Sequence, residues 1–237
     1  MKYGTILAGA ALTIAAQVSA TPSMSVVTVN TEDPVAYLEW ARKSGPDIGK
    51  AIEATAGGVC ISIAGFYSPG EVYYWHTFRD HASAMGASIY NEAVRKETRK
   101  LKLERTVSRS DLFSLVMAEE LLLDVGDTHS NWNLVISTDD PQLYKNQLNR
   151  ITDEATKRGF GDVSLSAHAY LAGEDAGDLL VMVRAPSKNR LGNILDQLNS
   201  DWMAPIMSGL SDIREYERGF LTNCTVTYVE GHRNSQD

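Results

Sequence analysis

The sequence is poor in the residue types that build most metal and nucleophile sites. It contains two cysteines and five histidines among 237 residues. The cysteines, Cys60 and Cys224, are too few and too far apart to frame a metal site. Glycine-rich phosphate loops, Gly-x-Ser-x-Gly elbows and His-Glu-x-x-His motifs are also missing. We therefore predict no metal ion, and the sequence leaves open whether the protein is an enzyme.

Positive charge is scarce as well. Lysine and arginine number 22 against 30 acidic residues, which gives a formal net charge of −8. This balance disfavours nucleic acids and anionic membranes as partners, because binding to phosphates requires a cationic surface. The local exception is the segment 95–102, RKETRKLK, which we interpret as the solvated end of a helix.

Long apolar runs are confined to the N-terminus. A charged start is followed by an apolar run from Ile6 to Ala16 and by the small-x-small sequence Val18-Ser19-Ala20. This pattern predicts a signal peptide over residues 1–20, and an uncleaved membrane anchor is the alternative. Cleavage would release a periplasmic or secreted protein that starts at Thr21 and no longer contacts a membrane. In an oxidising compartment its two cysteines can form one disulfide.

One stretch of the sequence occurs twice. Residues 27–37, VTVNTEDPVAY, return 107 positions later as residues 134–144, LVISTDDPQLY. Each copy reads as a β-branched strand that runs into a helix, with Asp33 or Asp140 placed to cap the helix and a proline at its first position. Two turns with the same Thr-acid-Asp-Pro-x-x-Tyr order indicate an internal duplication.

The order of predicted elements repeats in the same way. Each half reads β-α-β-β-α-β, the ferredoxin-like arrangement, in which one face of the sheet lacks helices. The first helix is expected to break at Ser44-Gly45-Pro46 and to resume to about residue 56. Two such halves can cover each other's bare sheet faces. The predicted segments are a signal peptide (1–20), a first repeat (21–116), a linker (117–131), a second repeat (132–229) and a disordered tail (230–237).

The repeated capped turn and the element order resemble the dimeric α+β barrel superfamily, here as two repeats in one chain. That superfamily includes antibiotic-biosynthesis-type monooxygenases, NIPSNAP-like proteins and chlorite dismutase-like haem proteins. The resemblance covers about residues 25–116 and 132–229. It implies an α+β fold in which two sheets pack face to face as an intrachain barrel. It also implies a central cavity that holds a small organic molecule or haem.

Strand alternation selects the side chains that would face such a cavity. The branched residues Val59, Ile61 and Ile63 should face the helices, which turns the residues between them inward. His168 is the best titratable candidate, although it could also lie on the surface near a turn. The face of strand 71–78 is not fixed by its pattern, and its aromatic run is also typical of a core. The expected ligand-binding residues are Ser62, Trp75, Asn133, Ser164, Ser166 and His168. The catalytic candidates are His168, His76 and Arg184.

The resemblance also implies a position for the two cysteines. With the ferredoxin-like strand order 4-1-3-2, the second and fourth strands are sheet edges. Cys60 lies on the second strand of the first half, and Cys224 lies on the fourth strand of the second half. The barrel would bring these edges to one seam, where the cysteines form a disulfide or remain two buried thiols.

Three functions are compatible with these observations. The first is binding of a small organic molecule in the barrel cavity, alone or with cofactor-free monooxygenase-like chemistry. The second is a non-enzymatic exported module that makes protein contacts through its acidic surface. The third is haem binding, for which His76, His81 or His168 could be the axial ligand. The protein is expected to be a monomer or a homodimer.

Overall fold

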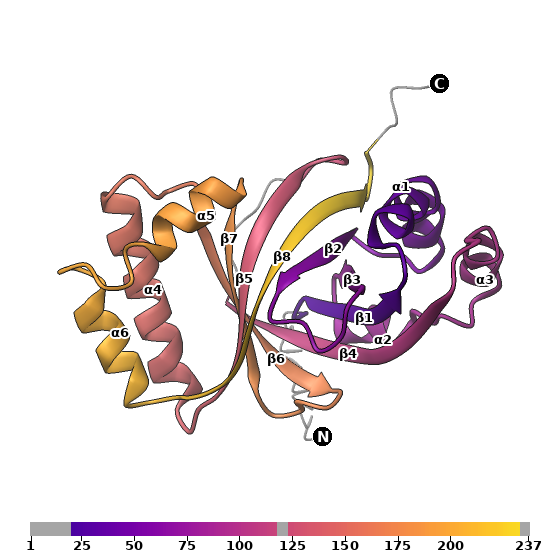
Figure 1. Ribbon diagram of the computed structural model, residues 1–237. Helices are drawn as coiled ribbons and strands as arrows, with labels where there is room; N and C mark the ends of the chain where they lie inside the picture. The colour runs from indigo at the N-terminus through magenta and orange to yellow at the C-terminus, as the bar shows by residue number, and fades with distance from the viewer. Residues whose placement is uncertain (1–19, 118–122, 233–237) are drawn as a thin grey trace, which may run out of the picture.

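The computed structural model describes residues 20–117 and 123–232. The predicted signal peptide therefore lies outside the described residues up to position 19, as do residues 118–122 of the linker and the tail from position 233. Within the described part, the chain has a mixed α+β fold with one closed barrel of eight strands and six helices outside it (Figure 1). The predicted α+β class and the single-chain barrel are confirmed.

The strands and helices alternate along the chain in an order close to the predicted one. The strands are β1 (Ser23–Thr31), β2 (Ala56–Ala64), β3 (Glu71–Phe78), β4 (Arg105–Met117), β5 (Thr128–Ser137), β6 (Ser164–Ala172), β7 (Leu179–Ala185) and β8 (Glu215–Val229). The helices are α1 (Pro34–Ala51), α2 (His81–Gly86), α3 (Glu92–Thr98), α4 (Pro141–Lys157), α5 (Lys188–Leu195) and α6 (Ala204–Ser211).

The barrel closes through two seams between the halves of the chain. Its strand order is β1-β3-β2-β8-β5-β7-β6-β4, with all neighbours antiparallel. Strands β1 to β4 form one arc, and strands β5 to β8 form the other. They meet where β2 pairs with β8 and where β4 pairs with β6. Because every strand has two partners, the barrel has no free sheet edge.

The repeated turns begin the long helices of both halves as the sequence predicts. The Asp33 carboxylate accepts hydrogen bonds from the backbone N–H groups of Val35 and Ala36, at 3.1 and 2.9 Å. Asp140 accepts one from Leu143 at 2.9 Å. A proline occupies the first turn in both helices, where its missing N–H costs no hydrogen bond.

The predicted break in the first helix is wrong, because α1 continues through Pro46. Tertiary packing outweighs the lost hydrogen bond here. A side-chain carbon at Gly45 would lie 2.7 Å from Thr227 Oγ1, and one at Gly49 would lie 2.4 Å from the Tyr228 ring. The glycines therefore let α1 approach β8 closely enough to bury its apolar face. The sequence also predicts one helix from residue 80 to about residue 103, but the structure has two short helices there, α2 and α3.

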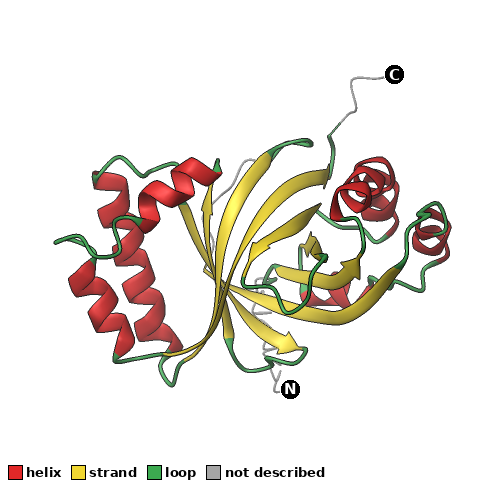
Figure 2. Ribbon diagram, viewed as in Figure 1, coloured by secondary structure: helices red, strands yellow, loops and turns green. Residues whose placement is uncertain are grey.

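Helices cover the outside of the barrel in two groups (Figure 2). One group consists of α1, α2 and α3 on the first arc, and the other consists of α4, α5 and α6 on the second. Strand alternation divides the side chains: Val29, Val59 and Val72 pack beneath the helices, whereas Cys60 and Trp75 belong to the core inside the barrel. No helix among residues 20–117 and 123–232 is long and apolar enough to cross a membrane.

Candidate functional site

The barrel encloses a cavity of about 260 Å³. Aromatic and long apolar side chains form its middle: Tyr73, Trp75, Phe113, Tyr170, Met182 and Phe220. The Phe113 and Tyr170 rings are 4.4 Å apart between centroids, and those of Tyr73 and Phe220 are 5.1 Å apart. Flat apolar walls of this kind suit a planar organic ligand.

One end of the cavity holds a cation without an acidic partner. Arg184, on β7, lies opposite Asn131 of β5 in the strand register, and His129 precedes Asn131 on the same inward face. His168 of β6 lies nearby and its Nε2 is 3.3 Å from Ser166 Oγ. Among the described residues, Arg184 makes no salt bridge and its Nε has no hydrogen-bond partner.

Burial and the Arg184 charge determine the protonation of this end. Burial, with a smaller contribution from the Arg184 cation, lowers the pKa of His129 to about 3 and that of His168 to about 4. Burial also lowers the pKa of Arg184 to about 10. At neutral pH the guanidinium is therefore the only charge here among the described residues, and both imidazoles are neutral.

The opposite end of the cavity is polar and carries charges of both signs. Arg109 forms ion pairs with Asp175 at 2.7 Å and with Asp111 at 3.3 Å. The Tyr73 hydroxyl donates to the Glu71 carboxylate, which also accepts a backbone N–H from the turn that follows β2. Arg218 of β8 lies over the Phe220 ring, 4.6 Å from its centroid, and its Nε and Nη1 have no hydrogen-bond partner among the described residues.

A disulfide joins Cys60 to Cys224 across the β2–β8 seam. The two cysteines are register partners, and Cys60 lines the cavity wall. They are 7% and 1% exposed. The bond connects β2 to β8 across a sequence separation of 164.

The structure brings together most of the side chains that the sequence selects. Trp75, Asn133, Ser166, His168 and Arg184 all line the barrel cavity.

Four of the residues named from the sequence lie elsewhere. Ser62 donates to the Glu71 carbonyl oxygen at 2.8 Å, and neither it nor Ser164 lines the cavity. His76 lies on the helix side of β3, because Tyr73, Trp75 and Thr77 take the inward face. His81 begins α2, outside the barrel.

Sequence reasoning missed His129, Asn131 and Arg218. The sequence predicts strands over residues 132–137 and 220–229, whereas β5 begins at Thr128 and β8 at Glu215. Extending the inward alternation of Asn133 back by two and four residues would have selected Asn131 and His129.

The barrel cavity of about 260 Å³ is small for haem, because cofactor sites usually measure about 300–1,000 Å³. Two histidines line it, and Nε2 of His129 has no hydrogen-bond partner among the described residues. His168 Nε2 faces the Ser166 hydroxyl. His76 does not lie in the barrel, and a side-chain carbon at Gly57 would be 3.0 Å from its Nε2, so backbone covers that nitrogen. Among the described residues no group of three or more His, Cys, Asp or Glu side chains could hold a metal ion.

Comparison with known proteins identifies the fold and no closer relationship. No family model matches the chain, and no curated protein matches it. A candidate monooxygenase from Fusobacterium nucleatum superposes with a TM-score of 0.55 at 10% identity, over 92% of this chain and 99% of the other. An anthrone oxidase-like protein gives 0.56 at 10% identity, over 91% and 96%. A candidate monooxygenase from Lactobacillus acidophilus gives 0.51 at 7% identity, over 88% and 95%.

These similarities extend across both arcs of the barrel. At such low identity they establish the fold alone, and they confirm the resemblance to the α+β barrel superfamily at that level. What the cavity binds must be argued from its own side chains.

Proposed function

We propose that the barrel cavity binds a small aromatic anion, with Arg184 as its counter-charge. The observation that carries this proposal is the position of Arg184 in a largely apolar cavity. Its Nε is buried without a partner, and no acidic side chain pairs with it among the described residues. Burying a cation is costly unless an anion or hydrogen bonds compensate for the lost water. A bound anion would supply both the negative charge and the hydrogen bonds.

The shape and chemistry of the cavity support an aromatic ligand. Rings from both arcs form its walls, and its volume of about 260 Å³ limits the ligand to a compact molecule. Asn131 and Asn133 provide further polar groups near the arginine. A planar acid could place its ring against Phe113 and Met182 while its oxygen atoms reach the guanidinium.

We further propose that His129 or His168 removes a proton from the bound ligand. Both are neutral because burial and the Arg184 cation lower their pKa values. The enolate or phenolate that forms beside Arg184 would offset that cation and raise the imidazole pKa as the proton moves, which favours general-base catalysis. Arg184 would then stabilise the enolate or phenolate that forms.

Such an anion could react with dioxygen without a cofactor. In this reaction an activated CH₂ group and O₂ give C=O and H₂O. The substrate carbon loses four electrons, one oxygen atom enters the carbonyl group, and the other leaves as water. The similarity to a candidate monooxygenase and to an anthrone oxidase-like protein supports testing this chemistry first.

Isothermal titration with 1-hydroxy-2-naphthoate tests the binding proposal. Replacing Arg184 with Gln removes a charge-assisted hydrogen bond and should weaken binding by about ten- to a hundredfold. The matched control is Arg42→Gln, which removes the same charge from the exposed surface of α1. Equal affinity in both variants, or no binding to the wild type, would contradict the proposal and favour the non-enzymatic interaction module.

Oxygen uptake with anthrone tests the chemistry separately. We expect one O₂ consumed per anthrone oxidised, with the rate reduced about a hundredfold when the catalytic histidine is replaced by Gln. If the rates of His129→Gln and His168→Gln both equal that of the wild type, neither imidazole is the base, even if the ligand binds.

We also propose that the protein is exported and that it arose by an internal duplication. The leader over residues 1–20 supports a periplasmic or secreted protein, and N-terminal sequencing of the mature chain should begin at Thr21. The two arcs, each with one capped strand-to-helix turn, support an origin as two ferredoxin-like repeats.

A further inference from the structure

A second cavity lies outside the barrel, between the first arc of the sheet and helices α1 and α3. Its volume is about 390 Å³, larger than that of the barrel cavity. Trp40 and Ile48 of α1, Val94 of α3 and Val27 of β1 form its apolar walls. The Trp40 indole N–H donates to the Glu97 carbonyl oxygen at 3.1 Å, which holds α3 against α1 without closing the space.

The sheet side of this cavity contains polar groups that a packed core would satisfy. Tyr74 and His76 line it from β3, and they are 8% and 5% exposed. Their rings are 4.6 Å apart between centroids. The Tyr74 hydroxyl has no hydrogen-bond partner in the described part of the chain. His76 Nε2 also lacks a partner there, but the Gly57 backbone covers it. Buried polar groups without partners are uncommon in finished cores.

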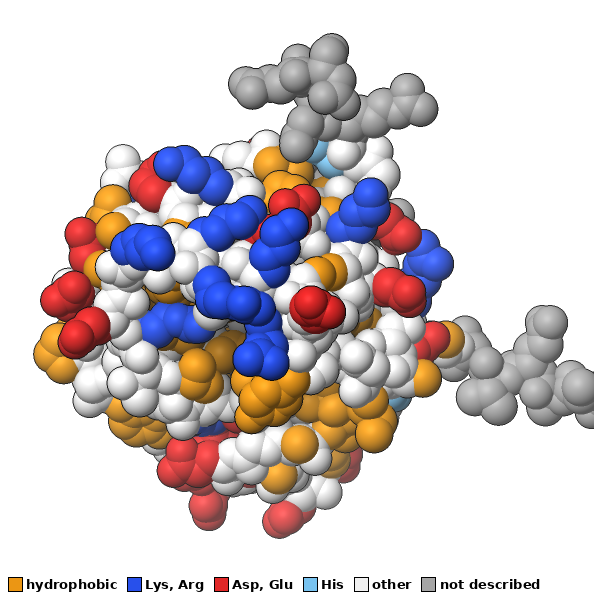
Figure 3. Space-filling view, turned by 90° about the vertical axis from the view of Figure 1, so that its right-hand side faces the viewer, with side chains coloured by type: hydrophobic (Ala, Val, Ile, Leu, Met, Phe, Trp, Pro, Cys, Tyr) orange, Lys and Arg blue, Asp and Glu red, His pale blue; other side chains and the backbone are white. Residues whose placement is uncertain are grey.

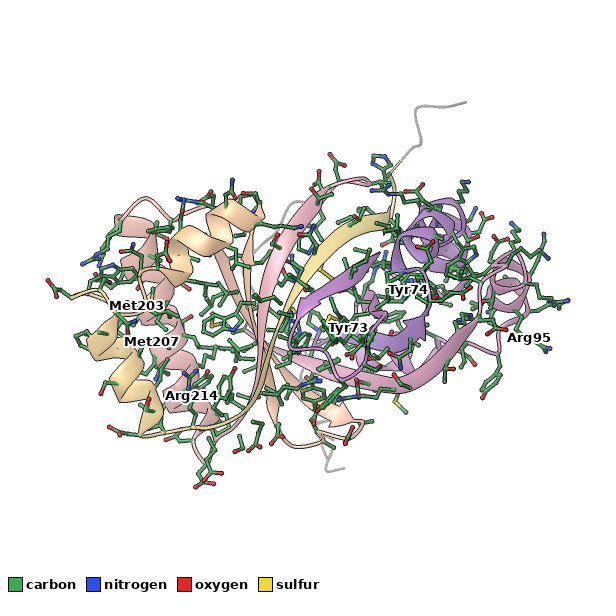
Figure 4. The ribbon with its side chains drawn as sticks, viewed as in Figure 1. Tyr73, Tyr74, Arg95, Met203, Met207 and Arg214 are labelled. Carbon is green, nitrogen blue, oxygen red and sulfur yellow. A yellow bond between two sulfur atoms is a disulfide. The ribbon has the colours of Figure 1, made fainter. Side chains whose placement is uncertain are left out.

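The rim of the cavity is cationic. Arg95 of α3, Arg99 at the C-cap of α3 and Arg105 of β4 line it, and no acidic side chain does so among the described residues. Figure 3, which looks onto this side of the molecule, shows Lys and Arg side chains gathered beside exposed hydrophobic ones. Figure 4 marks Tyr74 on the sheet and Arg95 on α3. Part of the basic segment 95–102 therefore borders an apolar opening, whereas the sequence alone suggested only a solvated helix end.

In the part of the chain that the structure describes, the corresponding layer of the second arc has only a small space. Between β7 and helices α4 to α6 the cavity is only about 50 Å³. The side chains that fill this region include Met203 and Met207, labelled in Figure 4. Val181 and Val183 of β7 take the helix-facing positions that Tyr74 and His76 take on β3. The open cavity is thus specific to the first half.

We propose that this second cavity binds an amphipathic organic anion. The apolar body of the ligand lies between Trp40, Val94 and the sheet. Its acid group lies at the rim, where the arginines of α3 and β4 bind it. The anionic charge is selected because three arginines and, among residues 20–117 and 123–232, no acids line the site. The apolar body is selected by the buried walls.

Quenching of tryptophan fluorescence by 10-bromodecanoate locates the bound ligand. Trp40 lines this cavity and Trp75 lines the barrel cavity. We expect saturable quenching that Trp40→Phe abolishes and Trp75→Phe retains. Quenching that is lost only in Trp75→Phe would place the ligand in the barrel and overturn the inference.

A matched pair of double variants tests the role of the rim. Arg95→Gln with Arg99→Gln removes two exposed charges that line the cavity. Lys96→Gln with Lys102→Gln removes two exposed charges from the same basic segment without touching the lining. We expect the first pair to weaken decanoate binding by about tenfold or more and the second to change it less than about twofold.

Three further outcomes would overturn the inference. They are equal losses in the two double variants, equal affinity for decanoate and neutral decan-1-ol, and no quenching at millimolar 10-bromodecanoate. Because these readouts depend on Trp40 and on α3, they are independent of naphthoate binding beside Arg184. Failure of this site and failure of the barrel site can therefore be distinguished.

Discussion

Removal of the disulfide at the β2–β8 seam should cost the protein much of its stability. Cys60 lies on β2 and Cys224 on the last strand, β8, and the bond between them closes a loop with a sequence separation of 164. The perturbation we propose is replacement of either cysteine, or of both, by Ala. Alanine adds no polar group at these buried positions, and Cys224→Ala also removes the sulfur that accepts a hydrogen bond from Asn131 Nδ2 at 3.5 Å.

The magnitude follows from the loop length. In the chain-entropy model a cross-link over a loop of this length lowers the entropy of the unfolded chain by about 17 cal/mol/K, which is about 5 kcal/mol at 25 °C. A domain of ordinary stability has only about 5–15 kcal/mol in total. Native strain and residual structure in the unfolded chain reduce the effect, so we expect a loss of about 3–5 kcal/mol.

Urea unfolding followed by circular dichroism measures this loss. The single variants and the double variant should be destabilised equally, because each removes the same bond. Wild-type protein under strong reducing conditions should match them. A loss below about 1 kcal/mol would show that the seam does not need its covalent link, and strongly additive losses would show that the cysteines act separately.

Two other predictions concern close packing and acid stability. A side-chain carbon at Gly58 would lie 2.5 Å from the Thr225 carbonyl oxygen, so Gly58→Ala should destabilise the seam by about 1–3 kcal/mol. The control is Gly192→Ala, where no atom lies within 4 Å, and it should stabilise α5 by about 0.5–1 kcal/mol. Equal urea midpoints for the two variants would refute this prediction. Burial lowers the pKa values of three histidines to about 4, 3 and 4: His76, His129 and His168. The histidines of the unfolded chain have pKa values of about 6.5, so between that pH and about pH 4 the unfolded chain binds more protons than the folded protein. The free energy of unfolding should therefore be undiminished above pH 6.5. Below pH 6.5 it should fall by up to about 1.4 kcal/mol per pH unit for each histidine. A urea midpoint that is unchanged from pH 7 to pH 5 would contradict this.

The barrel could be predicted because its signals are local and repeated. Asp33 and Asp140, each followed by proline, mark two strand-to-helix turns that the structure contains. The alternation of Val59 with Cys60 assigns one side chain to the helices and the other to the cavity, and the structure places them so. These patterns depend on the periods of strands and on capping chemistry, which a sequence displays directly.

The details of the site depend on contacts that the sequence does not display. His129 was assigned to a linker, because the turn-like residues before it hide the start of β5. The face of β3 could not be assigned, since Tyr73 to His76 are large on both sides. That Arg184 has no acidic partner among the described residues is known only from the fold, in which three strands bring Arg184 beside neutral histidines. The continuation of α1 through Pro46 could not be predicted, because the packing of α1 on β8 involves residues about 180 positions away in the chain.

A crystal structure of the protein with 1-hydroxy-2-naphthoate would test the central claim most directly. We predict that the naphthoate ring lies inside the barrel, against Phe113 and Met182. A carboxylate oxygen should lie within about 2.7–2.9 Å of the Arg184 guanidinium, as expected for a charge-assisted hydrogen bond. A ligand found outside the barrel, or a barrel without ligand at a concentration that saturates binding in solution, would contradict the account.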